Sequence, residues 1–507
     1  MKRREFISKS LTLGSSAALG VAGLTRSFAA SLPADITSMS ASILSAAIRQ
    51  KQLSCEEVMS AYLQRIHRYN PVYNAIVSLV DDDNLMAQAQ LADQDLARGR
   101  YHGWMHGMPH AVKDLTAVAG LPYTSGSPMF ADRIADEDSA MVARMRQQGA
   151  IFIGKTNTPE FGLGSQSYNQ VFPTTGCAYN SDLTSGGSSG GAASGLGTHM
   201  LPVADGSDMM GSLRNPGAFN NVIGFRPSVG LMGGGDPFSR GLSTAGPMGR
   251  NAEDAIRLLH TIAGEPGDHQ PQIIREQLPG PENFQPRDLS ELKIGWLGNF
   301  DNYLAMEPGI LELCESSLSN VSDAGAIVES CSVGFDMNDL WKSWLDLRNW
   351  SRTGMRGYLE NSDTRPLLKP ELVWEIEQSY LLTVDDIYQS NAARSRWYEE
   401  MNKLFDQYDF LVLPTAQVFP FPKNLNWPEE INGQTMDTYH RWMEIVVPGS
   451  LAGTPVINVP VGFDQRGRPM GMQVMGRFGE DKKVLEFALA YEEVSDHLSR
   501  RPSGMAG

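Results

Sequence analysis

Apolar positions near the start of the chain recur at helical spacing. Between residues 34 and 100 they lie three or four positions apart, as at Leu44 and Ile48, which is the repeat of one face of an α-helix. Ser54 and Glu57 stand three positions apart just ahead of another apolar run, a pattern typical of a capping box at a helix start. We therefore predict that this segment is mainly helical.

The pattern changes after residue 100. From 101 to 260, glycine-rich loops separate short apolar runs, such as Ala150 to Ile153, from helix-like stretches such as Ser139 to Gln148. Short apolar runs bounded by glycine are typical of buried strands, and their alternation with helices predicts an α/β core.

The second half of the chain combines helices with a few strands. A strand is predicted at Lys293 to Leu297, and helices dominate from there to residue 405. Further strands are predicted at Phe410 to Leu413, Val456 to Val461 and Met470 to Met475. The segment Pro266 to Asp288 is rich in proline, glutamine and glutamate, which favours a surface connection and makes it the best candidate for a domain boundary. A chain of 507 residues has room for about three domains or one unusually large one.

The first thirty residues differ in composition from the rest. Arg3 and Arg4 precede a weakly apolar stretch from Leu11 to Leu24, and small residues flank a cleavage pattern at 27–29. This arrangement resembles a twin-arginine export signal over residues 1–30. A single membrane anchor is the alternative, but glycines and serines leave the stretch short of the roughly 20 strongly apolar residues that a span needs. We expect a periplasmic or secreted protein with no stable membrane span.

Composition and charge exclude several classes of protein. Apolar residues make up 41% of the chain and charged residues 20%, which is typical of a globular protein and not of a disordered one. The formal net charge is −16, so the chain lacks the basic surface that nucleic acid requires. The four cysteines include no C-x-x-C pair, which argues against a structural zinc site. Whether Cys314 and Cys331 form a disulfide is left open.

Two short motif matches do not fit their structural context. Residues Gly149 to Thr156 match the P-loop pattern, but their four variable positions form an apolar strand and cannot fold into a phosphate-binding loop. Residues Gly187 to Gly191 match the G-x-S-x-G elbow of α/β-hydrolases. The preceding residues make a poor strand, however, and the only histidines late in the chain are His440 and His497.

A stronger constellation combines two glycine- and serine-rich segments with a lysine. The stretch Thr184 to Ala192 is followed by Gly206 to Arg214, and Ala111 to Asp114 lies upstream. Glycines let a backbone approach a reacting group closely, and serines supply hydroxyls as nucleophiles or proton relays. The first segment alone would more often be a flexible loop. Its combination with the second within an α/β region favours catalysis.

At these residues the sequence resembles the amidase signature family of serine hydrolases. The resemblance covers nearly the whole chain after the leader and extends through four further blocks: Gly107 to Asp114, Gly154 to Glu160, Gly224 to Ser228, and Leu451 to Gln473. It implies a single α/β domain over residues 31–507, with a mixed, mostly parallel twisted sheet surrounded by helices. Residues at about 265–405 would form a variable, mainly helical region of that domain.

The resemblance also implies the roles of three residues. Ser212 would be the nucleophile, Ser188 the bridging serine held by a cis peptide, and Lys113 the base. A lysine can act as a base only when neutral, so its pKa must fall from about 10.4 toward roughly 7 or 8, which burial can achieve. Ser188 would relay the proton between Ser212 and Lys113.

Further positions follow from the same resemblance. The backbone N–H groups of Met209, Met210, Gly211 and Ser212 would form the oxyanion hole, with Ser189, Asp208 and Arg214 as supporting residues. Phe161, Gly162 and Leu163 would lie on a loop that lines the substrate pocket. Met210 occupies a position that is usually glycine in the family, which puts the shape of the acyl pocket in question. Ser185 replaces a common proline, which should matter little.

These observations predict a hydrolase of carboxylic amides without a metal or organic cofactor, acting on small molecules, with a homodimer left open. We expect a neutral, apolar acyl group, because the sequence identifies no Arg or Lys beside the apolar pocket residues. One alternative is the transamidation role of related subunits that release ammonia from glutamine, although this needs cytosolic partners. A carbamate or ester hydrolase and a noncatalytic binding module on the same fold are the others.

Overall fold

The computed structural model describes residues 33–232, 241–263 and 278–505. The predicted export signal at 1–30 lies outside these residues. Asp35–Gly507 form one compact unit, so the segment Pro266 to Asp288 does not separate two domains. Part of that segment, 266–277, also lies outside the described residues.

An eight-stranded mixed sheet forms the centre of this unit, with the strand order β10-β9-β11-β15-β14-β7-β8-β6. The bounds are β6 Ala204–Asp208, β7 Ile223–Arg226, β8 Thr244–Gly249, β9 Lys293–Trp296, β10 Ile327–Ser330, β11 Phe410–Pro414, β14 Val456–Phe463 and β15 Pro469–Met475. The strands that the sequence predicts at the positions of β9, β11, β14 and β15 are confirmed.

The prediction of a mostly parallel sheet is wrong. Strand β9 pairs in parallel with β10 and β11, whereas the pairs from β11 through to β6 are antiparallel. A short connection explains one of these pairs, because only a tight turn at Asp464 to Arg468 joins β14 to β15 and so forces them to run in opposite directions.

A second, three-stranded sheet has the order β1-β3-β2, with bounds β1 Ile76–Val77, β2 Pro109–Lys113 and β3 Ile151–Thr156. Strands β2 and β3 are parallel. The variable positions of the P-loop match fall in and just before β3, which is buried along its length, so the match is accidental. The remaining strands of the described residues form two small hairpins: β4 Gly176–Cys177 with β5 Asn180–Thr184, and β12 Glu430–Ile431 with β13 Gln434–Thr435.

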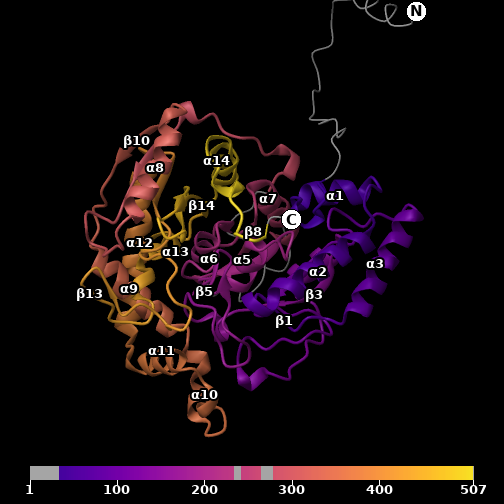
Figure 1. Cartoon of the computed structure of the whole chain (residues 1–507). Coiled ribbons are helices and arrows are strands. Elements are labelled where there is room, and N and C mark those ends of the chain that lie inside the picture. Colours follow the sequence, from indigo (N-terminus) through magenta and orange to yellow (C-terminus); the bar gives the residue numbers. More distant parts are fainter. Residues whose placement is uncertain (1–32, 233–240, 264–277, 506–507) are drawn as a thin grey trace, which may run out of the picture. The chain divides into compact units, whose positions relative to one another are not determined.

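Helices surround the large sheet (Figure 1). Their bounds are α1 Ala41–Arg49, α2 Cys55–Tyr73, α3 Asp82–Ala97, α4 Ala140–Gln147, α5 Gly190–Gly197, α6 Arg214–Phe219, α7 Ala252–Ala263, α8 Ile310–Asp323, α9 Met337–Trp350, α10 Arg356–Glu360, α11 Pro370–Leu381, α12 Val384–Phe405, α13 Val447–Ala452 and α14 Asp481–Val494. Ser54 and Glu57 form the predicted capping box at the start of α2.

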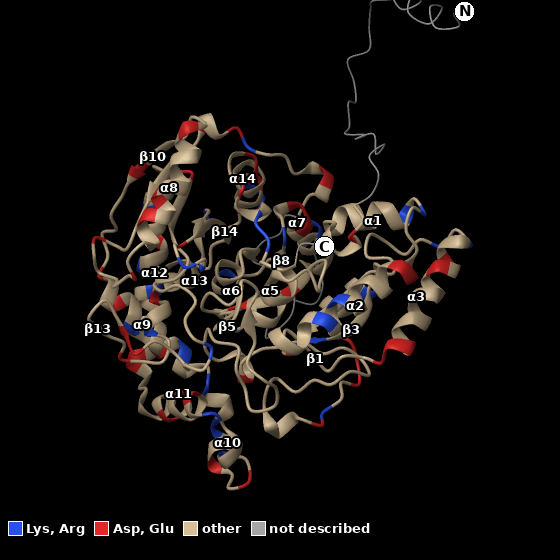
Figure 2. Ribbon diagram, viewed as in Figure 1, with Lys and Arg blue, Asp and Glu red and all other residues tan. Residues whose placement is uncertain are grey.

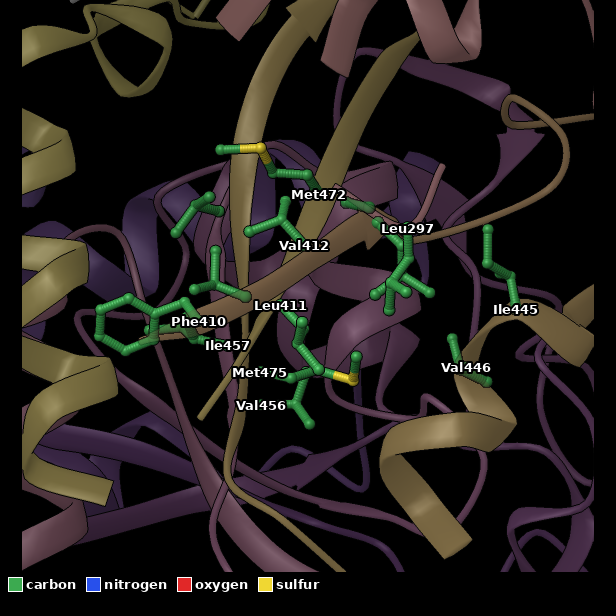
Figure 3. Close-up of a cluster of buried hydrophobic side chains, with 14 of the residues drawn as sticks. Leu297, Phe410, Leu411, Val412, Ile445, Val446, Val456, Ile457, Met472 and Met475 are labelled. Atoms are coloured by element: carbon green, nitrogen blue, oxygen red, sulfur yellow. The ribbon is translucent and has the colours of Figure 1, made fainter. Parts of the chain in front are cut away.

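The main apolar core lies on β11, β14 and β15. Strand β11 is buried along its whole length, and its side chains meet those of the neighbouring strands in one cluster that extends to Ile445 and Val446 (Figure 3). Val446 also packs closely against a loop far away in sequence, because a Cβ placed on Gly211 would lie 2.9 Å from its methyl groups. The core therefore contacts the segment in which the nucleophile is expected.

Charged residues of both signs are interspersed along the peripheral helices (Figure 2). Among the described residues, no helix is both long and apolar enough to cross a membrane. All four cysteines are free thiols.

Candidate active site

Lys113 ends strand β2 and is 1% exposed. Its Nζ donates hydrogen bonds to Ser188 Oγ and Ser189 Oγ, each at 2.8 Å, and to Ser207 Oγ at 3.1 Å. Burial lowers the pKa of Lys113 to about 7, although the carboxylates of Asp205 and Asp208 oppose this shift. A substantial fraction of Lys113 is thus neutral near pH 7 and able to accept a proton.

Ser188 follows a cis peptide bond with Gly187, just before helix α5. The loop of η3 (Glu160–Gly162) lies beside its hydroxyl. Gly162 has φ +72°, and a Cβ there would lie 3.4 Å from Ser188 Oγ and 2.9 Å from a Leu115 methyl group. Glycine is therefore favoured at 162 by its backbone conformation, and a larger residue would crowd Leu115 beside Ser188.

Ser212 lies on the loop between β6 and α6 and is 7% exposed. The carboxylate of Asp208 shapes this loop by accepting hydrogen bonds from the N–H groups of Gly211 at 2.9 Å and Leu213 at 3.1 Å. Because the Gly211 N–H already donates to Asp208, we expect the N–H groups of Met209, Met210 and Ser212 to form the oxyanion hole.

Asp208 is itself held by two buried arginines. Arg214 donates to both carboxylate oxygens, at 2.9 and 3.0 Å, and Arg226 lies 3.4 Å from one of them. Burial alone would raise the pKa of Asp208, but Arg214 and Arg226 hold it well below its usual range. Arg214 also donates to Ser450 Oγ at 2.7 Å, which ties the loop to helix α13.

A cavity of about 230 Å³ opens over Ser188, Ser207 and Ser212. Its apolar wall consists of Leu115, Phe161, Met209 and Met210. Phe161 and Gly162 thus line the cavity, as the family resemblance implies.

Leu163 lies elsewhere. It is fully buried in a separate apolar cluster with Leu368, Leu372 and Ile376, and it does not line the cavity.

Comparisons with known proteins agree with this arrangement. The family model described as Amidase matches residues 57–485. This chain belongs to the amidase signature family. It is 30% identical to an acylamidase of Rhodococcus erythropolis over 478 residues, covering 92% of this chain and 97% of the relative. It is 29% identical to the A-type subunit of the glutamyl-tRNA(Gln) amidotransferase of Cyanothece sp., covering 89% and 97%.

Solved structures show the same relationship. A bacterial aryl acylamidase of the amidase signature family superposes with a TM-score of 0.83 at 26% identity, covering 92% of this chain and 99% of that one. The peptide amidase from Stenotrophomonas maltophilia gives 0.72 at 26% identity, covering 93% and 99%. The chain is therefore an enzyme of the amidase class.

The amidase cavity also contains residues that sequence reasoning missed. Arg348, Arg352 and His440 line the wall that is contributed by α9, the turn after it and the start of η8 (Arg441–Val446). The prediction that the pocket offers no cationic partner is wrong. No motif surrounds these residues, and only the fold brings them to the cavity. Ser207, by contrast, lies within the glycine- and serine-rich segment and could have been found there.

Proposed function

We propose that this amidase hydrolyses carboxylic amides through an acyl-enzyme on Ser212. The observation that carries the proposal is the contact between Lys113 Nζ and Ser188 Oγ at 2.8 Å, together with a cavity that both Ser188 and Ser212 line. A buried lysine with a pKa of about 7 is matched to general-base work near neutral pH.

In the first half-reaction, Ser212 Oγ bonds to the amide carbonyl carbon. Its proton passes to Ser188 as the Ser188 proton passes to Lys113 Nζ. The N–H groups of Met209, Met210 and Ser212 stabilise the negative carbonyl oxygen. When the carbonyl re-forms, the C–N bond breaks, Ser188 gives its proton to the leaving amine, and Lys113 returns its proton to Ser188.

In the second half-reaction, water attacks the acyl carbon and its proton takes the same route to Lys113. Collapse of this intermediate releases the carboxylic acid and restores the Ser212 hydroxyl with the proton that Lys113 held. All protons and electrons balance with Lys113, Ser188 and Ser212 alone.

We also propose that the twin-arginine-type signal at 1–30 directs export of the enzyme to the periplasm or the medium. An exported enzyme would lack the cytosolic partners that transamidation needs, which favours hydrolysis over that alternative. The expectation of an apolar acyl group required a pocket without cations, and Arg348 and Arg352 in the cavity wall remove that basis.

Turnover assays test the proposal. Purified enzyme is given 4-nitroacetanilide and its ester and carbamate analogues, and release of the amine or alcohol is followed. We expect amide turnover to be lost in Ser212→Ala and retained in Ser243→Ala, because Ser243 lines the same cavity without a part in the proposed relay. Equal activity of the two variants would contradict the nucleophile, and turnover of esters or carbamates without amides would favour the alternative hydrolase.

A further inference from the structure

Two arginines share one carboxylate in the wall of the cavity. Glu375 on helix α11 is fully buried, and Arg352 Nε donates to its Oε2 at 2.7 Å. Arg348 Nε and the Tyr439 hydroxyl both donate to its other oxygen, Oε1. Despite burial, the two guanidinium groups lower the pKa of Glu375 to about 2, so this glutamate is ionised and neutralises only one of the two arginines.

The cavity therefore has an excess of positive charge. Among the described residues that line it, none is an aspartate, glutamate or lysine, while Arg348 and Arg352 both are present. Arg348 is 4% exposed, and its remaining nitrogens contact Met209 Sδ at 3.3 Å and the Tyr439 hydroxyl at 2.9 Å. Among the described residues, Glu375 is the one oxygen partner of Arg352. One terminal nitrogen of Arg352 has only a long contact of 3.9 Å with Met355 Sδ, so the terminal nitrogens retain donor capacity for a ligand.

His440 adds an unpartnered polar atom to the same wall. Burial and the nearby Arg348 lower the pKa of His440 to about 3, so the ring is neutral. Its Nδ1 lies 2.8 Å from Thr438 Oγ1, whereas its buried Nε2 has no hydrogen-bond partner. When the Thr438 hydroxyl donates to Nδ1, Nε2 carries a proton and is an unused donor of a residue that lines the cavity. A buried donor without a partner is costly unless a ligand satisfies it.

We propose that this amidase acts on amides that carry a carboxylate group and no ammonium group, and that Arg352, with Arg348 and His440, binds that carboxylate. The inference rests on the proposed function and specifies its substrate class. Guanidinium groups bind carboxylates through paired, charge-assisted hydrogen bonds, which are strongest where water is excluded.

The same wall disfavours amino acid amides such as glutamine. An α-ammonium group would need an acceptor or a counter-charge, and the described residues that line the cavity offer no free carboxylate. Next to two guanidinium groups it would instead meet like charge. A carboxylate without an ammonium group thus distinguishes this inference from the glutamine-dependent alternative.

Matched substrates test the preference. Glutaric acid mono-4-nitroanilide and hexanoic acid 4-nitroanilide differ by a carboxylate on the acyl side. 4-Acetamidophenylacetate and 4-ethylacetanilide differ by one on the amine side. We expect kcat/KM to favour the acid by at least about tenfold in one pair, and that pair identifies which side of the amide faces Arg352. Equal or better turnover of the neutral partner in both pairs would overturn the inference, as would a preference for glutamine.

A charge variant with a matched control tests whether Arg352 causes the preference for substrates with a carboxylate. Arg352→Gln should reduce the ratio of acid to neutral kcat/KM by at least about tenfold, mainly through the KM of the acid. Arg365→Gln removes the same charge from an exposed position outside the cavity and should leave the ratio unchanged. An unchanged ratio in Arg352→Gln, or the same fall in both variants, would overturn the inference.

Binding measurements keep the test independent of turnover. Calorimetry on Ser212→Ala should detect glutarate but not hexanamide, and adding Arg352→Gln should weaken glutarate binding at least about tenfold. Absence of glutarate binding by Ser212→Ala would contradict the inference. If neutral anilides acylate Ser212 of the unmutated enzyme but substrates with a carboxylate have no higher kcat/KM, only this inference fails. If no amide acylates Ser212, the proposed function fails as well.

Discussion

The two sides of the cavity come from different kinds of sequence. One side consists of glycine- and serine-rich loops that carry Ser188 and Ser212. Lys113, at the end of strand β2, contacts Ser188 from behind these loops. The other side consists of Arg348 on α9, Arg352 in the turn after α9, and His440 just before η8, and no sequence motif surrounds them. In the proposed mechanism the first side cleaves the bond, whereas the second holds fixed charge and takes no part in the proton relay. We therefore expect changes on the first side to slow every substrate alike, and changes on the second to alter the choice of substrate.

The largest effect is expected from Lys113→Met. This change removes the base but keeps an apolar stem in a buried site, so the fold should persist while amide turnover falls by about 10²- to 10⁴-fold. Steady-state kinetics on an acidic and a neutral anilide, with circular dichroism as a control for folding, measure it. A folded variant with near-normal turnover, or one that slows only one substrate, would contradict the role of Lys113 as a general base.

Asp208→Asn should lower the stability of the fold, because Asp208 holds the loop that carries Ser212. The change leaves Arg214 and Arg226 buried without their carboxylate, which typically costs about 3–5 kcal/mol of the free energy of unfolding. Urea unfolding followed by fluorescence measures the loss, with the exposed Asp437→Asn as the matched control. A loss below about 1 kcal/mol would mean that Asp208 does not hold the loop as described.

Gly162→Ala should have a smaller, catalytic effect. The added methyl group would crowd Leu115 and contact Ser188 Oγ, at a φ of +72° that alanine rarely adopts. We expect kcat to fall about tenfold for every substrate, consistent with about 1–2 kcal/mol of strain near the relay. Gly164→Ala is the control, because φ there is also positive but its Cβ would find ordinary contacts at 3.6 Å or more. Equal effects of the two changes would argue against crowding at Ser188.

The pH dependence should produce the mildest change. Because burial lowers the pKa of Lys113 to about 7 and the proposed mechanism requires its neutral form, kcat/KM should rise as the pH increases through about 7 and level off above it. Lys369 has a pKa that burial also lowers to about 7, so Lys369→Met is measured in parallel and should keep the same limb. A profile that falls with increasing pH over this range, or a limb that disappears in Lys369→Met, would contradict the assignment to Lys113.

The same contrast explains how much can be predicted from the sequence. Lys113, Ser188 and Ser212 stand in motifs, so their expected roles follow from a family resemblance alone. The strands around the core follow from their apolar runs, but the resemblance wrongly implies a mostly parallel sheet. Strand direction depends on how connections cross the sheet, which local pattern does not encode.

The positions of Arg348 and Arg352 in the cavity wall could not be predicted either, because they too depend on how distant elements pack. Arg348 and Arg352 lie four positions apart on and just after an amphipathic helix, where arginines are usually solvent-exposed. Only the packing of α9 against α11 shows that Glu375 draws them inward. The prediction for Leu163 is wrong because adjacent residues of a loop can face different environments, and Phe161 and Leu163 do so here.

Mapping of the covalent adduct tests the role of Ser212 as nucleophile most directly. The enzyme is treated with a fluorophosphonate, digested and examined by tandem mass spectrometry, with Ser212→Ala as the control. We predict one adduct, on the peptide that contains Ser212, and none in the variant. An adduct on Ser188 or Ser189 in the unmutated enzyme, or one that persists in Ser212→Ala, would contradict that role.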